Sequence, residues 1–118
     1  MKYMLMCCGE EEKLSGLSKR ECEALTEETS AYCEALHKSG HLITAEALEP
    51  VEMATTVRVR NGELSTTDGP FAETKEQVGG FFLINARDLN EAIQVASRFP
   101  SVRIGSMEVR PVREFKKP

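Results

Sequence analysis

Two helix-start signals, one in each half of the chain, constrain the fold most. Ser18 is followed three residues later by Glu21, and Asp88 is followed at the same spacing by Glu91. In each place the first side chain can accept a hydrogen bond from the backbone, and the Ser–Glu pair can form a complete capping box. Gly40 offers the left-handed residue that commonly ends a helix. The sequence therefore predicts two helices, one beginning after Ser18 and one after Asp88.

Strand-like segments surround these helices. Asn61-Gly62 is the strongest short signal for a two-residue hairpin, so the segments on either side of it should pair antiparallel. The order strand, helix, several strands, helix, strand is typical of a ferredoxin-like βαββαβ core, here with an inserted hairpin. The chain of 118 residues is expected to form a single α+β domain, 1–118. The expected strands are 2–8, 41–48, 55–60, 63–67, 80–84 and roughly 103–115.

Two of these strands, 2–8 and 80–84, carry apolar side chains on both faces. Both helices of a ferredoxin-like fold cover the same face of the sheet, so the other face is left apolar and open. Soluble monomers rarely expose a contiguous patch of that kind. We therefore expect a homodimer in which the two sheets face each other.

Composition excludes several classes of protein. The net charge of −4, with no basic cluster longer than Lys116-Lys117, argues against a nucleic-acid partner. No apolar run approaches the ~20 residues of a membrane span. The apolar start of the chain ends at Glu10-Glu11-Glu12 without a cleavage site of small residues, so it predicts a strand of a cytoplasmic protein. The four cysteines include no CxxC pair and are expected to be small buried side chains in a reducing compartment.

The segment between the hairpin and the strand at 80–84 is the most informative. It reads Asp68-Gly69-Pro70-Phe71-Ala72-Glu73-Thr74-Lys75-Glu76, and Gly79-Gly80-Phe81 follows. Long loops between strands tend to carry function, because a rigid scaffold can aim their side chains. This segment strongly resembles the YCII-related family, in particular its DGPF-domain branch. The resemblance also includes Lys2-Tyr3-Met4-Leu5, Thr55-Thr56-Val57-Arg58 and Gly105-Ser106-Met107-Glu108-Val109-Arg110-Pro111.

The resemblance covers nearly the whole chain and implies a dimeric α/β barrel of two ferredoxin-like subunits. It implies little about activity, because the family is known mostly as uncharacterised; members of the DGPF branch are often encoded beside extracytoplasmic-function sigma factors. Other YCII branches have a proposed active site: a His on the first helix works with an Asp that precedes a Pro after the second. Here His37 lies in the last turn of that helix, and Phe99 precedes Pro100. That pair is not carried over.

Asp68 is the candidate catalytic residue. Its side chain either builds the turn by a hydrogen bond to the backbone two residues on, or points into a cleft as a general base or a hydrogen-bond acceptor for a ligand. A carboxylate becomes a base near neutral pH when burial or a neighbouring like charge raises its pKa, and Glu73 and Glu76 could supply that charge. The candidate ligand-binding residues are Gly69, Pro70, Phe71, Glu73, Thr74, Glu76, Glu108 and Arg110.

Three further side-chain patterns bear on the site. Glu108 and Arg110 alternate along the last strand, so they share a face and form either a structural ion pair or the lining of a cleft in which Arg110 anchors an anion. Phe71 is expected to pin the loop to the core. His37 and His41 are separated by a helix-breaking glycine and have no partner at ligand spacing, so no metal is expected. The sequence contains neither a phosphate-binding loop nor a dinucleotide-binding motif, so no cofactor is expected.

Two functions remain open at this point. The first is a small-molecule-binding protein with a cofactor-independent proton-transfer activity in a cleft beside the Asp68–Phe71 loop. Asp68 would be its base, and Arg110 would anchor a small anionic or polar organic ligand. The second is a non-catalytic regulatory or protein-interaction module linked to an extracytoplasmic-function sigma factor. The sequence leaves open whether the chain is an enzyme.

Overall fold

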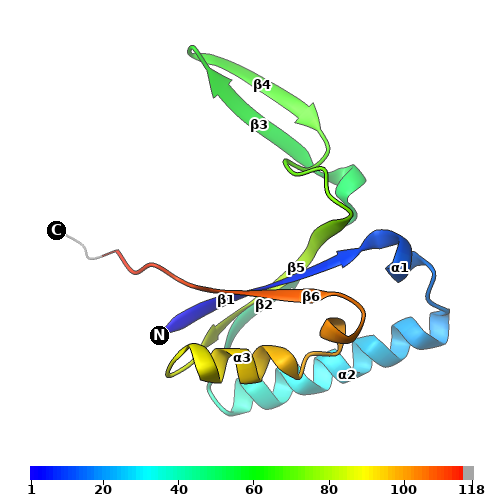
Figure 1. Cartoon of the computed structure of the whole chain (residues 1–118), viewed down its shortest axis with the longest axis vertical. Coiled ribbons are helices and arrows are strands. Elements are labelled where there is room, and N and C mark those ends of the chain that lie inside the picture. The colour runs from blue at the N-terminus through cyan, green and yellow to red at the C-terminus, as the bar shows by residue number, and fades with distance from the viewer. Residues whose placement is uncertain (116–118) are drawn as a thin grey trace.

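The computed structural model describes residues 1–115 as a four-stranded sheet, helices against one face of that sheet, and a separate hairpin (Figure 1). In chain order the elements are β1 (Lys2–Glu10), α1 (Glu11–Ser15), α2 (Lys19–Lys38), β2 (Leu42–Ala47), the 3₁₀ turn η1 (Val51–Met53), β3 (Thr55–Arg60), β4 (Glu63–Asp68), β5 (Glu76–Asn85), α3 (Leu89–Ser97), the 3₁₀ turn η2 (Pro100–Arg103) and β6 (Ser106–Pro111).

The four-stranded sheet has the order β2-β5-β1-β6, and every neighbouring pair in it is antiparallel. Helix α2 connects β1 to β2, and α3 connects β5 to β6, so each helix spans two strands that are not neighbours. This is the topology of a ferredoxin-like βαββαβ core. The α+β fold predicted from the sequence is confirmed. The dimeric barrel stays a prediction.

Both helix-start signals form as the sequence predicts. The Ser18 Oγ accepts a hydrogen bond from the Glu21 amide at 3.1 Å, and the Glu21 carboxylate accepts one from the Ser18 amide at 3.2 Å. At α3, the Asp88 carboxylate accepts from the Glu91 amide at 2.9 Å. Gly40, with φ at 81°, follows the end of α2. Within residues 1–115 no helix is both long and apolar enough to cross a bilayer.

The core lies between the sheet and the two long helices. Phe99, only 1% exposed, stacks on Phe82 with ring centroids 4.0 Å apart and meets the Tyr32 ring edge-on at 4.7 Å. The Tyr32 hydroxyl donates to the Val95 carbonyl at 2.7 Å, which satisfies its polar end. The other buried side chains of this cluster include Tyr3, Leu5, Leu36, Ile84, Ala92 and Ala96.

The opposite side of the sheet, which we call the open face, carries a central apolar strip. Strand alternation places Met4 and Met6 of β1, together with Phe81 and Leu83 of β5, on this side. All four are only partly buried. One cross-strand row of this face runs from Glu46 through Phe81 and Met6 to Glu108, so a carboxylate stands at each end of the row.

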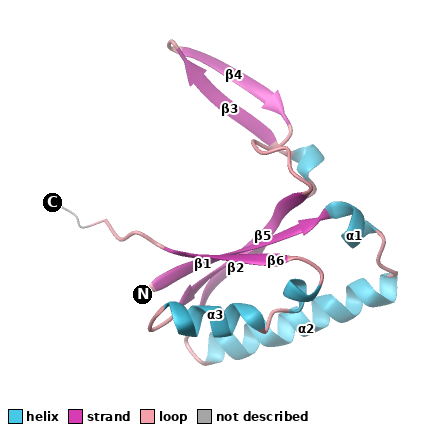
Figure 2. Ribbon diagram, viewed as in Figure 1, coloured by secondary structure: helices cyan, strands magenta, loops and turns pink. Residues whose placement is uncertain are grey.

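Strands β3 and β4 form a hairpin that we call the arm, residues 55–68. Its turn has positive φ at Asn61 and Gly62, 53° and 76°, as the hairpin signal predicts. Within residues 1–115 these two strands pair only with each other. The arm extends away from the sheet, on the side opposite α2 and α3 (Figure 2).

The bounds of three predicted strands were wrong by two residues or more. Strand β1 extends to Glu10 and β5 begins already at Glu76, because these two residues pair with each other across the sheet. The connecting loop is therefore only residues 69–75. Strand β6 is shorter than 103–115, since residue 103 belongs to the 3₁₀ turn η2 and residues 112–115 lie outside the strand. Cys22 is exposed on α2, so the expectation that all four cysteines are buried was also wrong.

Candidate functional site

The Asp-Gly-Pro segment forms the turn that leaves the arm. Gly69, with φ at 105°, donates its amide hydrogen to the Ala54 carbonyl at 2.7 Å, and the Thr56 hydroxyl donates to the Gly69 carbonyl at 2.8 Å. Asp68 is exposed and pairs with Thr55 across the arm. The positive φ of Gly69 explains why glycine stands there. The backbone therefore accounts for the turn, and the Asp68 side chain points to solvent in a single chain.

The remainder of the loop is held by its own side chains. The Thr74 hydroxyl donates to the Glu76 carbonyl at 2.5 Å. The Gln77 amide group donates to the carbonyls of Ala72 and Thr74 at 2.8 and 2.9 Å. Gln77 was not among the sequence candidates; its place at the end of a charged loop was the only available signal. Glu73 is exposed. Thr74 and Gln77 therefore fix the loop conformation.

Phe71 does not pin the loop to the core, contrary to the sequence expectation. Its side chain is 81% exposed, and the Arg58 guanidinium lies 5.8 Å from the ring centroid. That distance is within the range of a cation–π contact, which contributes about 0.5–1 kcal/mol at exposed sites. The arm and the loop that follows it extend away from the sheet, so the Phe71 ring lies beside Arg58 of the arm and not in the core.

Two adjoining clefts lie beside the loop, and we call them together the loop groove. The first, of about 490 Å³, lies between the β2–η1 connection and Phe71, with apolar lining that includes Met53 and Pro70. The second, of about 720 Å³, continues to the end of β1. Both volumes fall in the range of small-molecule sites. The two clefts share Leu48, Glu49, Pro50, Gln77 and Val78.

The charge of the groove is negative. Among the residues that the structure describes, neither Lys nor Arg lines either cleft, whereas the second is lined by carboxylates. One of these has a structural role: the Glu11 carboxylate accepts a hydrogen bond from the Val51 amide at 2.9 Å, which ties α1 to η1. The lining carboxylates are Glu10, Glu11, Glu12, Glu49 and Glu52.

Two thiols line the inner end of the groove. Burial raises the pKa of the Cys7 thiol, against the opposing effect of a 3.7 Å contact with the Ser101 hydroxyl. Burial also raises the pKa of the Cys8 thiol, and the carboxylates of Glu108 and Glu76 raise it further. Because the thiolate is the nucleophile, both cysteines are poor candidates for nucleophilic catalysis.

Glu108 and Arg110 form an ion pair on the open face of β6. Their side chains are 46% and 67% exposed, and neither lines the loop groove. Asp68 does not line it either. The structure therefore separates the predicted site into three places: the groove beside the loop, Asp68 on the arm, and the Glu108–Arg110 pair on the sheet.

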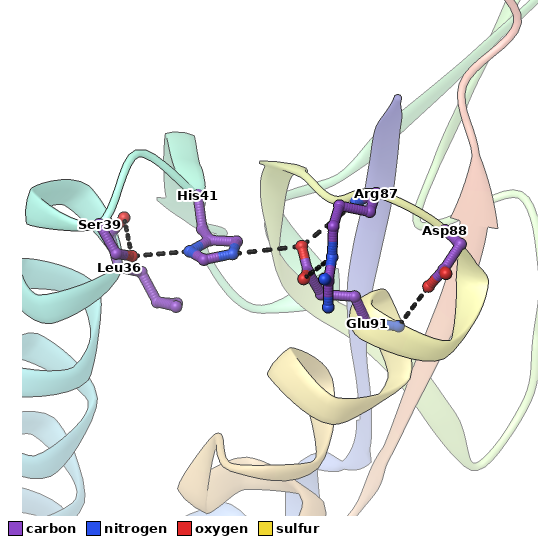
Figure 3. A network of polar contacts seen from close by, with 6 residues as sticks. All are labelled: Leu36, Ser39, His41, Arg87, Asp88 and Glu91. Atoms are coloured by element: carbon purple, nitrogen blue, oxygen red, sulfur yellow. Dashed lines mark hydrogen bonds and ion pairs between the residues drawn. The ribbon is translucent and has the colours of Figure 1, made fainter.

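A polar network that the sequence analysis missed joins the α2–β2 turn to the start of α3 (Figure 3). His41 Nδ1 lies 2.7 Å from the Ser39 Oγ, and His41 Nε2 lies 3.3 Å from Glu91 Oε1. Arg87 donates to the same carboxylate through its backbone amide at 3.2 Å and its Nε at 2.6 Å. The Arg87 backbone amide is the largest cause of the lowered pKa of Glu91, followed by the Arg87 side chain and then His41.

This network lies apart from the loop groove, since none of its members lines either cleft. Its hydrogen bonds join the α2–β2 turn to the start of α3. Within residues 1–115, no three His, Cys, Asp or Glu side chains lie close enough to hold a metal ion.

Comparison with known proteins places the chain in a family. A model of the YCII-related domain matches residues 1–116. An uncharacterised protein of Rhizobium meliloti (strain 1021) is 38% identical over 118 aligned residues, which cover 98% of this chain and 95% of that protein. These matches extend over the sheet, the helices and the arm, so the chain belongs to the YCII-related family.

Proposed function

We propose that the loop groove binds a small polar organic molecule that is uncharged or positively charged. The observation that carries this proposal is the cleft of about 490 Å³ beside the loop, at the place where the sequence predicts a functional segment. Its apolar lining offers surface for a carbon skeleton, and Phe71 stands exposed at its edge. A few polar groups around an apolar cleft are typical of small-molecule sites.

The charges around the groove favour this class of ligand over an anion. Five glutamates line its second cleft without a lysine or arginine among the described residues. Two of them are already engaged, Glu10 by the Lys13 ammonium and Glu11 by the Val51 amide, which leaves Glu12, Glu49 and Glu52. A bound carboxylate or phosphate would meet repulsion there, whereas an amine would be attracted. Arg110, which suggested an anionic ligand from the sequence, is paired with Glu108 on the sheet.

Proton transfer by Asp68 is the finer part of the proposal. In one chain Asp68 is exposed on the arm and lies outside the groove. A catalytic role therefore requires a second chain beside it. We propose the homodimer expected from the sequence, because the apolar strip of the open face remains uncovered in one chain.

The proposal is tested by thermal shift with small amines, alcohols, phenols and carboxylic acids. A molecule that binds the folded state stabilises it by about 2.7 kcal/mol at a concentration one hundred times its Kd. Phe71→Ala should reduce the shift caused by an amine or phenol. Phe115→Ala is the matched control, since Phe115 is 86% exposed and lines neither cleft.

Three outcomes decide between the functions. A shift with amines or alcohols that Phe71→Ala reduces and Phe115→Ala preserves supports the groove as the site. A preference for carboxylic acids contradicts the charge argument. No shift with any compound class contradicts small-molecule binding and returns the choice to a regulatory or protein-interaction module.

A further inference from the structure

The arm has its apolar side turned to water. Val57 and Val59 of β3 and Leu64 of β4 are 61%, 58% and 69% exposed, and Val59 pairs directly with Leu64. The opposite side of β3 is the less exposed one, since Thr56 and Arg58 are partly buried. An isolated two-stranded hairpin is marginally stable in water at best. A stable arm therefore needs a surface that covers these three side chains.

The arm and the open face are uncovered on the same side of the molecule. Helices α2 and α3 lie against one face of the sheet, and the arm extends on the other side (Figure 1). A single partner that approached the open face would therefore also meet the arm. The strip formed by Met4, Met6, Phe81 and Leu83 would be covered in the same event.

The area available fits a second copy of this chain. Strands of six residues at about 3.3 Å each, four of them about 4.8 Å apart, span roughly 400 Å² of flat area. The arm adds roughly 200 Å² by the same measure. Because accessible surface exceeds flat area, the sum approaches the ~800 Å² that each partner contributes to a stable interface. The sheet face alone falls further short.

The docking face of the arm is apolar rather than cationic. Alternation places Arg58 and Arg60 on the face opposite to Val57, Val59 and Leu64, so the apolar side chains and not the arginines would meet the sheet of the other copy. In a symmetric dimer this contact occurs twice.

We propose that the arm docks on a second copy of this chain through Val57, Val59 and Leu64, so that Asp68, at the base of the same arm face, is directed at that copy. The proposal rests on the homodimer of the proposed function. It deepens that function, because the candidate base becomes part of a site that one chain cannot form. Alternation supports the geometry, since Thr55 pairs with Asp68 and Thr55 shares its face with the two valines.

Sedimentation velocity on matched variants tests the docking. Val59→Glu places a charge on the apolar face of the arm, and Ser65→Glu adds the same charge to its other face, because Ser65 pairs with Arg58. We expect Val59→Glu to raise the dimer dissociation constant by roughly 100-fold, the effect of losing an interface hot spot. Ser65→Glu should change it by less than about threefold. A monomeric wild type, or equal effects of the two variants, would overturn the proposal.

A second pair of variants tests the position of Asp68. Asp68→Lys and Thr67→Lys are neighbours on β4 and lie on opposite faces of the arm. Weakened dimerisation in Asp68→Lys alone supports an Asp68 that faces the other copy. Equal behaviour of the two variants contradicts it. Circular dichroism checks that all four variants retain the fold, and hydrogen exchange of the arm amides in wild type should slow as the protein concentration rises.

The dimerisation experiments and the thermal-shift screen test the two proposals separately. If Val59→Glu dissociates the dimer and no compound binds, docking of the arm holds and small-molecule binding fails. If compounds bind equally to wild type and to monomeric Val59→Glu, binding in the groove holds and the two-copy site fails.

Discussion

The body of the molecule and the arm are built from similar strands that have opposite surroundings. In β1 the alternate residues Tyr3 and Leu5 are 3% and 0% exposed, because α2 and α3 cover them. In β3 the alternate residues Val57 and Val59 are about 60% exposed, because no helix of residues 1–115 covers the arm. The comparison shows that alternation defines which side chains share a face, whereas a tertiary or quaternary partner determines whether that face is buried.

The largest expected effect lies in the body. Phe99→Ala removes the ring that stacks on Phe82 and meets Tyr32 edge-on. Because Phe99 is 1% exposed, the cavity and the lost burial should lower the free energy of unfolding by about 3–5 kcal/mol. Chemical denaturation measures this loss. A loss below about 1 kcal/mol would show that the core is less closely packed at this position than the contacts indicate.

The next effect lies where β6 approaches β1. A Cβ on Gly105 would collide with the Cys8 backbone carbonyl, which cannot move as a flexible side chain does. Gly105→Ala should therefore lower the free energy of unfolding by about 1–3 kcal/mol through strain. Gly79→Ala is the control, because its Cβ would meet no atom within 4 Å. Similar denaturation midpoints for the two variants would contradict the close approach.

A smaller effect is expected in the arm. Gly62 has φ at 76°, which an alanine adopts only with strain of about 1–2 kcal/mol. Gly62→Ala should speed hydrogen exchange in residues 55–68 and leave the amides of β1 and β5 unchanged. Gly9→Ala is the matched control, since its added Cβ would meet no atom within 4 Å and its φ is ordinary. Equal acceleration in the body would show that arm and body unfold as one unit.

Local signals allowed much of the fold to be predicted. The Ser18–Glu21 box, the Asp88 cap and the Asn61-Gly62 turn each act within a few residues, so they operate in the same way in any tertiary setting. The start of β5 was predicted too late, because its first residues are held by pairing with the end of β1, more than sixty residues away in sequence. Strand pairing over that distance leaves no local signal.

The candidate site was predicted less completely than the fold. The loop was identified, and the groove does lie beside it, but half of the residues that line the first cleft come from the segment 48–54 between β2 and β3, whose sequence showed no motif. Phe71 is exposed because the arm extends away from the core, and no residue near Phe71 in the sequence indicates that the arm does so. His41 meets Glu91 across fifty residues, so the network between them was found only in three dimensions.

The smallest effect concerns that network and depends on pH. The pKa of Glu91 is lowered in the folded protein, mainly by the Arg87 backbone amide. A carboxyl group with a lowered folded pKa adds stability that is fully present above its unfolded pKa and is lost as the pH falls through the folded value. Glu91→Gln should therefore melt below wild type at pH 7, and the difference should shrink in acid below the usual carboxyl pKa.

The control is Glu34→Gln, whose ion pair with Lys38 is exposed on both sides and should contribute little at any pH. If the deficit of Glu91→Gln is the same at pH 7 and in acid, the carboxylate charge does not hold the α2–β2 turn against α3, and the neutral hydrogen bonds alone join these two parts of the body.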